Sequence, residues 1–231
     1  MQLRIAFAGT ADFASTHLQH LIAAQKYKIV SVYTKADKAI GRGQTIQYSK
    51  VKQLALEHNL TLYQPASLDN SVITQQIADQ QLDVLIVVAY GLKIPVSLLH
   101  LPKYGCINVH ASLLPKYRGA APIQDAILAG DSATGVSIMQ MDEHIDTGPV
   151  LLQQSCPILP SDTSDSLYLK LASLGKQALV GALDQLASLR PQAQNDALAS
   201  GSKKIRKQDG LINWQQDAAT IERQIRAYNS W

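Results

Sequence analysis

A continuous apolar run at residues 84–88, Val-Leu-Ile-Val-Val, limits the fold of this chain more than any other feature. A strand that is apolar on both faces has to be covered on both faces, as the central strands of parallel sheets are. Strand-like and helix-like segments alternate around this run. We therefore predict a doubly wound α/β domain with a mostly parallel sheet and helices on both faces. Ligands of such folds bind beyond the carboxyl ends of the strands.

Hydrophobic periodicity places the individual elements. Strands are predicted at residues 3–8, 29–33, 61–63, 83–88 and 104–107, and helices after Gly9, at 50–58, around 72–77, from 167 to about 190 and at 221–228. Residues 34–49 are predicted to form a long polar loop. A loop of this length in a compact domain is more often functional or disordered than filler.

The composition excludes several classes of protein. The chain has 231 residues, of which 46% are hydrophobic, so it is globular and not disordered as a whole. No apolar run is long enough to cross a membrane, and the first residues lack the pattern of a signal peptide. Cys106 and Cys156 lack the spacing of a zinc site or disulfide framework. We expect a cytoplasmic protein with no metal and no membrane partner.

Two nucleotide-binding motifs are absent from the sequence. The loop after the first strand has the single glycine Gly9 and lacks the G-x-G-x-x-G fingerprint of dinucleotide sites. Gly41-Arg42-Gly43 is not followed by Lys-Ser/Thr and is not a P-loop. The lysines and arginines in residues 35–52 and 203–207 suit a phosphate backbone, but most basic loops are simply solvated.

Asn108, His110 and Asp146 form the strongest candidate for a site. Asn108 and His110 are two residues apart, so both side chains leave an extended strand on the same face. An Asn amide can donate to a developing oxyanion, and a His can move a proton near neutral pH. Asp146 precedes Thr147-Gly148, a turn signal, from which it can orient the imidazole. The same pair also fits a hydrogen-bonded strand end with no catalytic role.

Further motifs agree with this pair in order and spacing. They are Asn108-Val109-His110-Ala111-Ser112-Leu113-Leu114-Pro115, Asp146-Thr147-Gly148, residues 4–13, Gly41-Arg42-Gly43, residues 87–91 and Arg226-Ala227-Tyr228-Asn229. Together they resemble the 10-formyltetrahydrofolate-dependent formyltransferases. Within that superfamily the chain is most similar to the methionyl-tRNA formyltransferase family, over essentially its whole length.

The resemblance implies a function and a set of site residues. The expected reaction transfers a formyl group from the cosubstrate 10-formyltetrahydrofolate to initiator methionyl-tRNA for translation initiation, by a monomeric enzyme. The implied residues are Asn108, His110 and Asp146 for catalysis, Ser112, Leu113, Leu114, Pro115, Ala89, Tyr90, Gly91 and Leu92 for folate, and Arg42, Lys35 and Lys38 for tRNA. The loop at residues 140–145 is expected to wall the pterin as well.

The expected domain organisation follows from the same resemblance. Residues 1–190 are predicted as the catalytic domain and the polar stretch 191–210 as a linker. Residues 211–231 are predicted to start the connection to a C-terminal, tRNA-binding barrel domain that is absent from this chain.

A few positions depart from the family pattern. His144 stands where glycine is usual and Pro149 where aspartate is usual, and both lie in the loop beside Asp146. Ala11 replaces a common proline, and the prolines that usually flank Ser49 in the expected tRNA-facing loop are missing. His144 itself is expected to be an exposed loop residue.

Three functions therefore remain open at this point. They are a methionyl-tRNA formyltransferase, a nucleotide-sugar N-formyltransferase with the same folate chemistry, and a non-enzymatic doubly wound binding module. Gly41-Arg42-Gly43 and Ala120-Ala121-Pro122-Ile123 favour the first over the second. The intact Asn, His and Asp set argues against the third.

Overall fold

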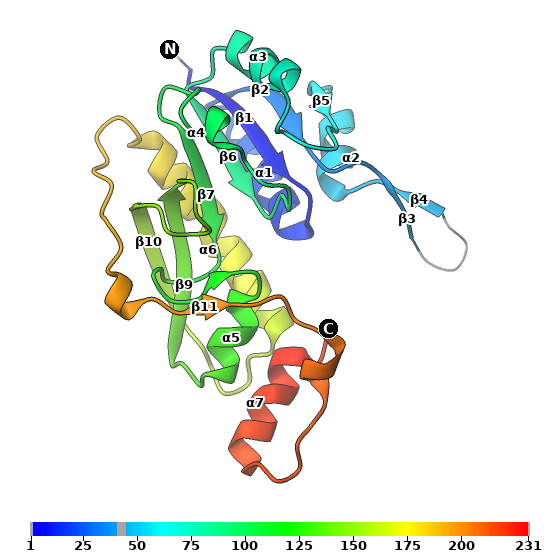
Figure 1. The fold of residues 1–231 in the computed structure, drawn as a ribbon, viewed down its shortest axis with the longest axis vertical. Helices are drawn as coiled ribbons and strands as arrows, with labels where there is room; N and C mark the ends of the chain where they lie inside the picture. The colour runs from blue at the N-terminus through cyan, green and yellow to red at the C-terminus, as the bar shows by residue number, and fades with distance from the viewer. Residues whose placement is uncertain (1, 41–44, 231) are drawn as a thin grey trace.

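A computed structural model describes residues 2–40 and 45–230. Within these residues a seven-stranded sheet has the strand order β10-β9-β7-β6-β1-β2-β5 (Figure 1). Its strands are β1 (Arg4–Gly9), β2 (Lys28–Tyr33), β5 (Leu62–Tyr63), β6 (Val84–Val88), β7 (Cys106–His110), β9 (Ala133–Gln140) and β10 (Val150–Pro157). The five strands from β7 to β5 are parallel, and β9 and β10 add an antiparallel edge.

Helices cover both faces of the sheet, as the apolar β6 requires. One face packs against α1 (Asp12–Ala24), α2 (Lys50–Glu57), α5 (Pro122–Leu128) and α6 (Ser164–Asp184), and the other against α3 (Ser71–Asp79) and α4 (Val96–Leu99). Within β6, Val84, Ile86 and Val88 belong to the first core, and Leu85 and Val87 to the second. The doubly wound, mostly parallel fold is confirmed.

Several elements differ from the sequence prediction. β9 and β10 were not predicted, and the expected loop 34–49 contains an antiparallel pair, β3 (Lys38–Ile40) and β4 (Thr45–Gln47). α6 ends at Asp184 and not near residue 190, because residues 185–189 close into turns through backbone bonds such as Ser188 N to Gln185 O. The other predicted strands and helices are present, with ends shifted by a few residues.

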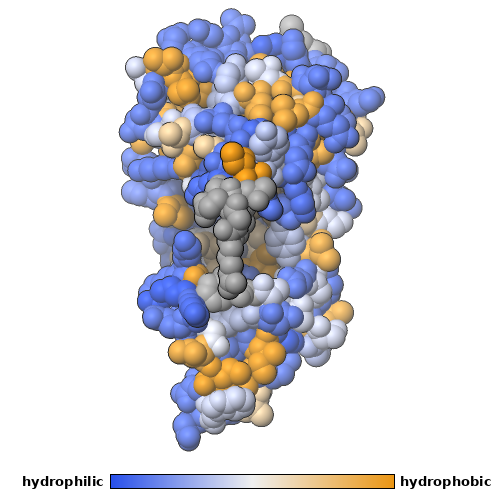
Figure 2. All heavy atoms as spheres, turned by 90° about the vertical axis from the view of Figure 1, so that its right-hand side faces the viewer, coloured by the Kyte–Doolittle hydropathy of each residue, from blue (hydrophilic) through white to orange (hydrophobic). Residues whose placement is uncertain are grey.

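The chain after α6 runs back across the domain (orange in Figure 1). It contains the short helix η1 (Asp196–Leu198), then β11 (Gly201–Ser202), which pairs with β8 (Arg118–Gly119). A second short helix, η2 (Lys207–Gly210), leads to α7 (Ala218–Tyr228), which packs on α5. Exposed hydrophobic side chains, among them Leu211 and Ile225, gather at this end of the molecule (Figure 2). None of the helices described is long and apolar enough to cross a bilayer.

Candidate active site

β7 sets the positions of Asn108 and His110. The Cys106 side chain packs in the core beneath α3 and α4, while Val109 packs in the opposite core. Side chains alternate along a strand, so Asn108 and His110 leave β7 on the same face as Cys106. This part of the prediction is confirmed. His110 is the last residue of β7 and thus lies at the carboxyl edge of the sheet.

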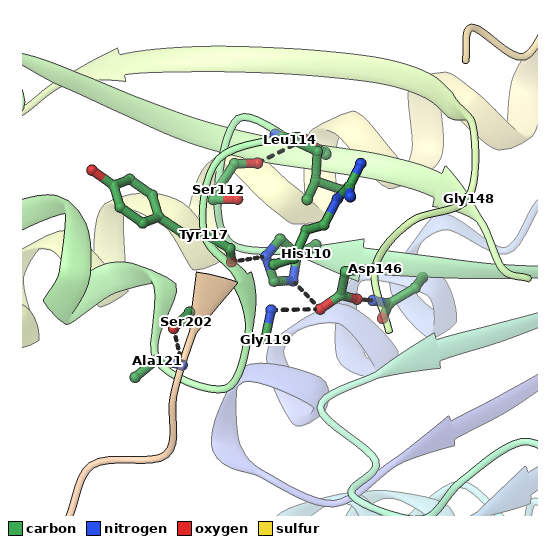
Figure 3. Close-up of polar contacts among 12 residues, drawn as sticks. His110, Ser112, Leu114, Tyr117, Gly119, Ala121, Asp146, Gly148 and Ser202 are labelled. Carbon is green, nitrogen blue, oxygen red and sulfur yellow. Dashed lines mark hydrogen bonds and ion pairs between the residues drawn. The ribbon is translucent and has the colours of Figure 1, made fainter. Parts of the chain in front are cut away.

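The loop between β9 and β10 brings Asp146 to these two side chains (Figure 3). The Asn108 amide donates to Oδ1 of Asp146 over 3.2 Å, and Nδ1 of His110 lies 3.5 Å from Oδ2. The backbone N–H of Gly119 donates to the same Oδ2 over 2.9 Å. Little of this carboxylate is exposed, so its partners act in a medium where charge interactions are stronger than in water.

The second ring nitrogen of His110 has a partner that fixes its role. Nε2 lies 2.9 Å from the carbonyl oxygen of Tyr117, which can only accept, so Nε2 carries a proton. Nδ1 is therefore the ring nitrogen that faces Asp146. Tyr117 is held in turn by its own hydroxyl, which donates to Asp131 over 2.8 Å. The result is an imidazole of fixed orientation beside a carboxylate.

The site combines donors and a proton acceptor without an activated nucleophile. The Asn108 amide uses one N–H for Asp146 and keeps a second for another acceptor. Burial raises the pKa of the Cys106 thiol to about 12, so this neighbouring side chain stays protonated near neutral pH. Oxyanion stabilisation and proton transfer are what an amine needs to attack an acyl donor without a covalent enzyme intermediate.

The predicted folate residues that follow β7 form a loop whose backbone is held by hydrogen bonds to serine side chains. Ser112 is fully buried, and its hydroxyl donates to the carbonyl of Lys116 over 2.6 Å. The hydroxyl of Ser137 on β9 donates to Ser112 O over 2.6 Å and accepts from Leu114 N over 3.0 Å. Leu113 and Pro115 are half-buried. Ser112 therefore has a structural role in the loop, and folate binding by these residues stays a prediction.

The second predicted folate segment follows β6, the strand beside β7. Ala89 has φ 42° and Gly91 has φ 74°, so the chain turns sharply there. Thr10, which follows β1, donates its hydroxyl to the Tyr90 carbonyl over 3.0 Å and joins this turn to the next strand end. Tyr90 is buried, and its hydroxyl has no partner among the residues described. Leu92 is half-buried in the same core. Both predicted folate segments thus lie at the carboxyl ends of adjacent strands.

The predicted tRNA residues are only partly placed by the structure. Lys35 and Lys38 line a cleft of about 600 Å³ with Thr10, Asp12 and residues of the β4–α2 connection. The Lys35 ammonium lies directly over Gly91, since a Cβ at that glycine would be 2.6 Å from Nζ. Lys35 therefore connects the cleft with the predicted folate turn. Arg42, with Gly41 and Gly43, lies outside the described residues.

Sequence reasoning missed residues that hold the site together. Tyr117 and Gly119 act through backbone atoms, and Gln194 donates its side-chain amide to the carbonyls of Asp146 and Gly148. The expected linker 191–210 thus contacts the site directly.

His144 is exposed, as expected. In residues 2–40 and 45–230, no three His, Cys, Asp or Glu side chains come together as metal ligands, and the metal-free reaction stays a prediction.

The chain is similar to known formyl-transferring proteins. A family model described as "Formyl transferase" matches residues 3–183, and one described as "Formyl transferase, C-terminal domain" matches residues 204–231. The methionyl-tRNA formyltransferase of Pseudoalteromonas translucida is 51% identical over 231 residues, with 99% of this chain and 72% of the relative covered. That of Idiomarina loihiensis is 53% identical, with 99% and 73% covered.

A solved structure has the same fold at lower identity. It is the N-formyltransferase of Helicobacter canadensis in complex with folinic acid and dTDP-3-aminofucose. The TM-score is 0.72 at 21% identity, with 98% of this chain and 81% of that chain covered. At this identity the likeness concerns the fold alone.

Proposed function

The chain belongs to the methionyl-tRNA formyltransferase family and is a formyl-transferring enzyme, and from this premise we propose that Asn108, His110 and Asp146 carry out the transfer. The donor is 10-formyltetrahydrofolate and the acceptor is the amino group of initiator methionyl-tRNA. The reaction takes place in the cytoplasm, on a monomeric enzyme, and provides formylmethionyl-tRNA for translation initiation.

The shared carboxylate of Asp146 is the observation that carries this proposal. It accepts from Asn108, from Gly119 and, at 3.5 Å, faces His110. β7, β8 and the loop between β9 and β10 therefore meet at one charged group at the carboxyl edge of the sheet. A strand end without a catalytic role has no need of a partly buried carboxylate beside an imidazole, because burying charge is costly.

The proposed step forms one bond and breaks another. The neutral amine of the methionyl group attacks the formyl carbon, and the bond from that carbon to N10 of the folate breaks. The oxygen of the tetrahedral intermediate accepts from the free N–H of Asn108 and from the Nδ1 side of a protonated His110, each worth about 3 kcal/mol of barrier. Asp146 takes the proton that the amine loses, directly or through water, and passes it by the same route to N10, which leaves as the amine of tetrahydrofolate.

The two loops after β6 and β7 are proposed to hold the folate. Residues 89–92 and 112–115 flank the carboxyl end of β7, where the reacting carbon has to lie next to Asn108. The similar structure from Helicobacter canadensis holds folinic acid, a folate derivative, on the same fold. The backbone of residues 112–115, fixed by Ser137, supplies a rigid wall for such a ligand.

We propose that the tRNA acceptor is bound by Arg42, Lys35 and Lys38. Lys35 and Lys38 line a cleft at the carboxyl ends of β1 and β2, and Lys35 also lies over Gly91 of the proposed folate turn. A backbone phosphate bound in this cleft would lie at the same edge of the sheet as the proposed catalytic residues. We propose residues 1–190 as the catalytic domain and 191–210 as the linker. Residues 211–231 lie within the match to the family's C-terminal domain, and we propose that they begin a part that helps bind tRNA.

A competition between acceptors tests the function. The protein is incubated with 10-formyltetrahydrofolate and an equimolar mixture of methionyl-tRNA and dTDP-3-aminofucose, and both products are quantified with time. We expect formylmethionyl-tRNA as the main product. Formylation of the amino sugar at a comparable or higher rate overturns the proposal.

A further inference from the structure

Residues 192–202, which we call the strap, cross both loops that carry the candidate site. At its start, Gln192 exchanges two backbone hydrogen bonds of 2.8 Å with Val150, just after the Asp146 loop. At its end, Ser200 O accepts from Arg118 N over 2.8 Å and Ser202 O accepts from Ala120 N over 3.1 Å. The strap therefore ties the start of β10 to β8.

Gln194 makes the strap's contact with the site itself. Its Oε1 accepts from Nε and Nη2 of Arg118 over 3.0 and 2.9 Å. Its Nε2 donates to the carbonyls of Asp146 and Gly148 over 2.9 and 2.7 Å. Both donors and both acceptor positions of one primary amide are thereby used. A half-buried glutamine at the surface does not need to use its full hydrogen-bonding capacity within the protein unless the orientation of its side chain matters.

The loop that Gln194 holds has a backbone that needs support. Asp146 has φ 55°, a left-handed conformation that costs a non-glycine residue about 1 kcal/mol or more. Gly148 is confined as well, because a Cβ there would lie 1.9 Å from Gln140 O. The two bonds from Gln194 fall on the carbonyls at either end of this turn. They restrain the rotation that would move the Asp146 carboxylate away from His110.

The same amide also fixes the opposite side of the carboxylate. Oδ2 of Asp146 accepts from Gly119 N. Gly119 follows Arg118, whose guanidinium donates to the side-chain oxygen of Gln194. One side chain thus bridges the backbone that carries the carboxylate and the strand that donates to it. Figure 3 shows how close Gly119 lies to Asp146 and His110.

We infer that Gln194 is a positioning residue of the formyl transfer, which acts by holding the Asp146 carboxylate between Asn108, His110 and Gly119. This inference rests on the catalytic role proposed for Asp146. Among the described residues the Gln194 side chain bonds to Arg118, Asp146 and Gly148, so its effect should fall on turnover and not on folate binding. A side chain that only stabilises the fold would change thermal unfolding and leave the turnover of the folded enzyme unchanged.

The matched control is Asp196, also on the strap. Asp196 accepts from the same Arg118 guanidinium over 2.7 Å but makes no bond to residues 146–148. The variant Gln194→Glu adds a second comparison, since a carboxylate can still accept from Arg118 but cannot donate to the two carbonyls. It keeps the strap attached while the Asp146 loop loses its support.

Single-turnover formylation of methionyl-tRNA is measured for Gln194→Ala, Gln194→Glu and Asp196→Ala, with KM for the folate and thermal unfolding alongside. Misplacement of a catalytic group can cost up to about a hundredfold, so we expect turnover to fall about 10- to 100-fold in both Gln194 variants. KM for the folate and the activity of Asp196→Ala should stay within about twofold of the parent, a change of under 0.5 kcal/mol. The inference is overturned if Gln194→Glu has the same turnover as the parent.

A double-mutant cycle with Asp146→Asn identifies the route of the effect. If Gln194 acts through Asp146, Gln194→Ala should cost less than about threefold when Asp146 is already replaced. An equal loss in both backgrounds overturns the inference, because Gln194 then acts elsewhere. If Gln194→Ala keeps the turnover of the parent while Asp146→Asn loses it, only the positioning role is refuted. If Asp146→Asn itself keeps full turnover, the proposed catalytic set is refuted as well.

Discussion

Nδ1 of His110 lies 3.5 Å from Oδ2 of Asp146, while the other ring nitrogen of His110 is held by the carbonyl of Tyr117. The imidazole therefore donates from Nε2 to Tyr117 O, and Nδ1 is the ring nitrogen that faces the carboxylate. The separation is longer than the 2.7–2.9 Å of a charge-assisted hydrogen bond. Catalytic contacts often tighten only when substrate is bound.

Asn108 and His110 are each expected to be needed for turnover. Loss of one oxyanion donor typically lowers the rate by a hundredfold or more, so Asn108→Ala and His110→Ala should both do so in single-turnover formylation. Ser155→Ala, an exposed position on β10, is the control and should keep parent activity. Circular dichroism and thermal unfolding verify the fold. If either variant keeps near-parent activity, that residue does not have the proposed role.

Arg42 is expected to act on tRNA and not on folate. Each phosphate contact adds to the salt dependence of binding, so Arg42→Ala should raise KM for methionyl-tRNA and flatten its dependence on salt. Folate binding should be unchanged. Lys28→Ala removes a cation at the amino end of β2, away from the carboxyl ends, and is the matched control. Identical methionyl-tRNA kinetics for Arg42→Ala and the parent at two salt concentrations would leave this arginine without a substrate role.

His17 is expected to make folding stability depend on pH. Burial lowers its pKa from 6.5 to about 4, and its Nε2 has no partner in the described part of the chain. The unfolded chain takes up the proton near pH 6.5 and the folded chain only near pH 4. Its contribution is therefore complete above pH 6.5 and is lost as the pH falls towards 4. The loss can reach about 3 kcal/mol.

Urea unfolding at several pH values measures this effect. The variant His17→Gln should have a flatter dependence of the unfolding free energy on pH in this window, while His58→Gln, at an exposed histidine, should follow the parent curve. Parallel curves for His17→Gln and the parent would assign the pH dependence to other groups.

The sequence predicted the parts of the fold that depend on hydrophobic pattern. The apolar run of β6 and the periodicity of α1 and α6 reflect burial against the sheet, and burial is what periodicity reports. β9 and β10 escaped prediction because they are held by long-range antiparallel pairing, and β10 mixes half-buried and exposed residues. The β3–β4 pair was hidden in a segment that reads as polar loop.

The candidate site was predictable where side chains do the chemistry and not where backbone atoms do. Asn108 and His110 could be placed on one face from their spacing alone. Tyr117 and Gly119 contribute a carbonyl and an N–H, which any residue type supplies. Gln194 lies in a polar stretch without periodicity, and only the folded chain brings its amide to the Asp146 loop. The hydroxyl of Ser112 is bonded inside its own loop, which the sequence did not indicate, and folate binding at Ser112 stays a prediction.

The rate of Asp146→Asn in single-turnover formylation of methionyl-tRNA, measured together with folate affinity, tests the proposed mechanism most directly. An asparagine can keep a hydrogen bond to Gly119 N but can neither accept a proton nor stabilise a protonated His110. We expect the rate to fall about a hundredfold or more, with the folate Kd within about twofold of the parent. An unchanged rate, or equal losses in rate and folate affinity, would contradict the role proposed for Asp146.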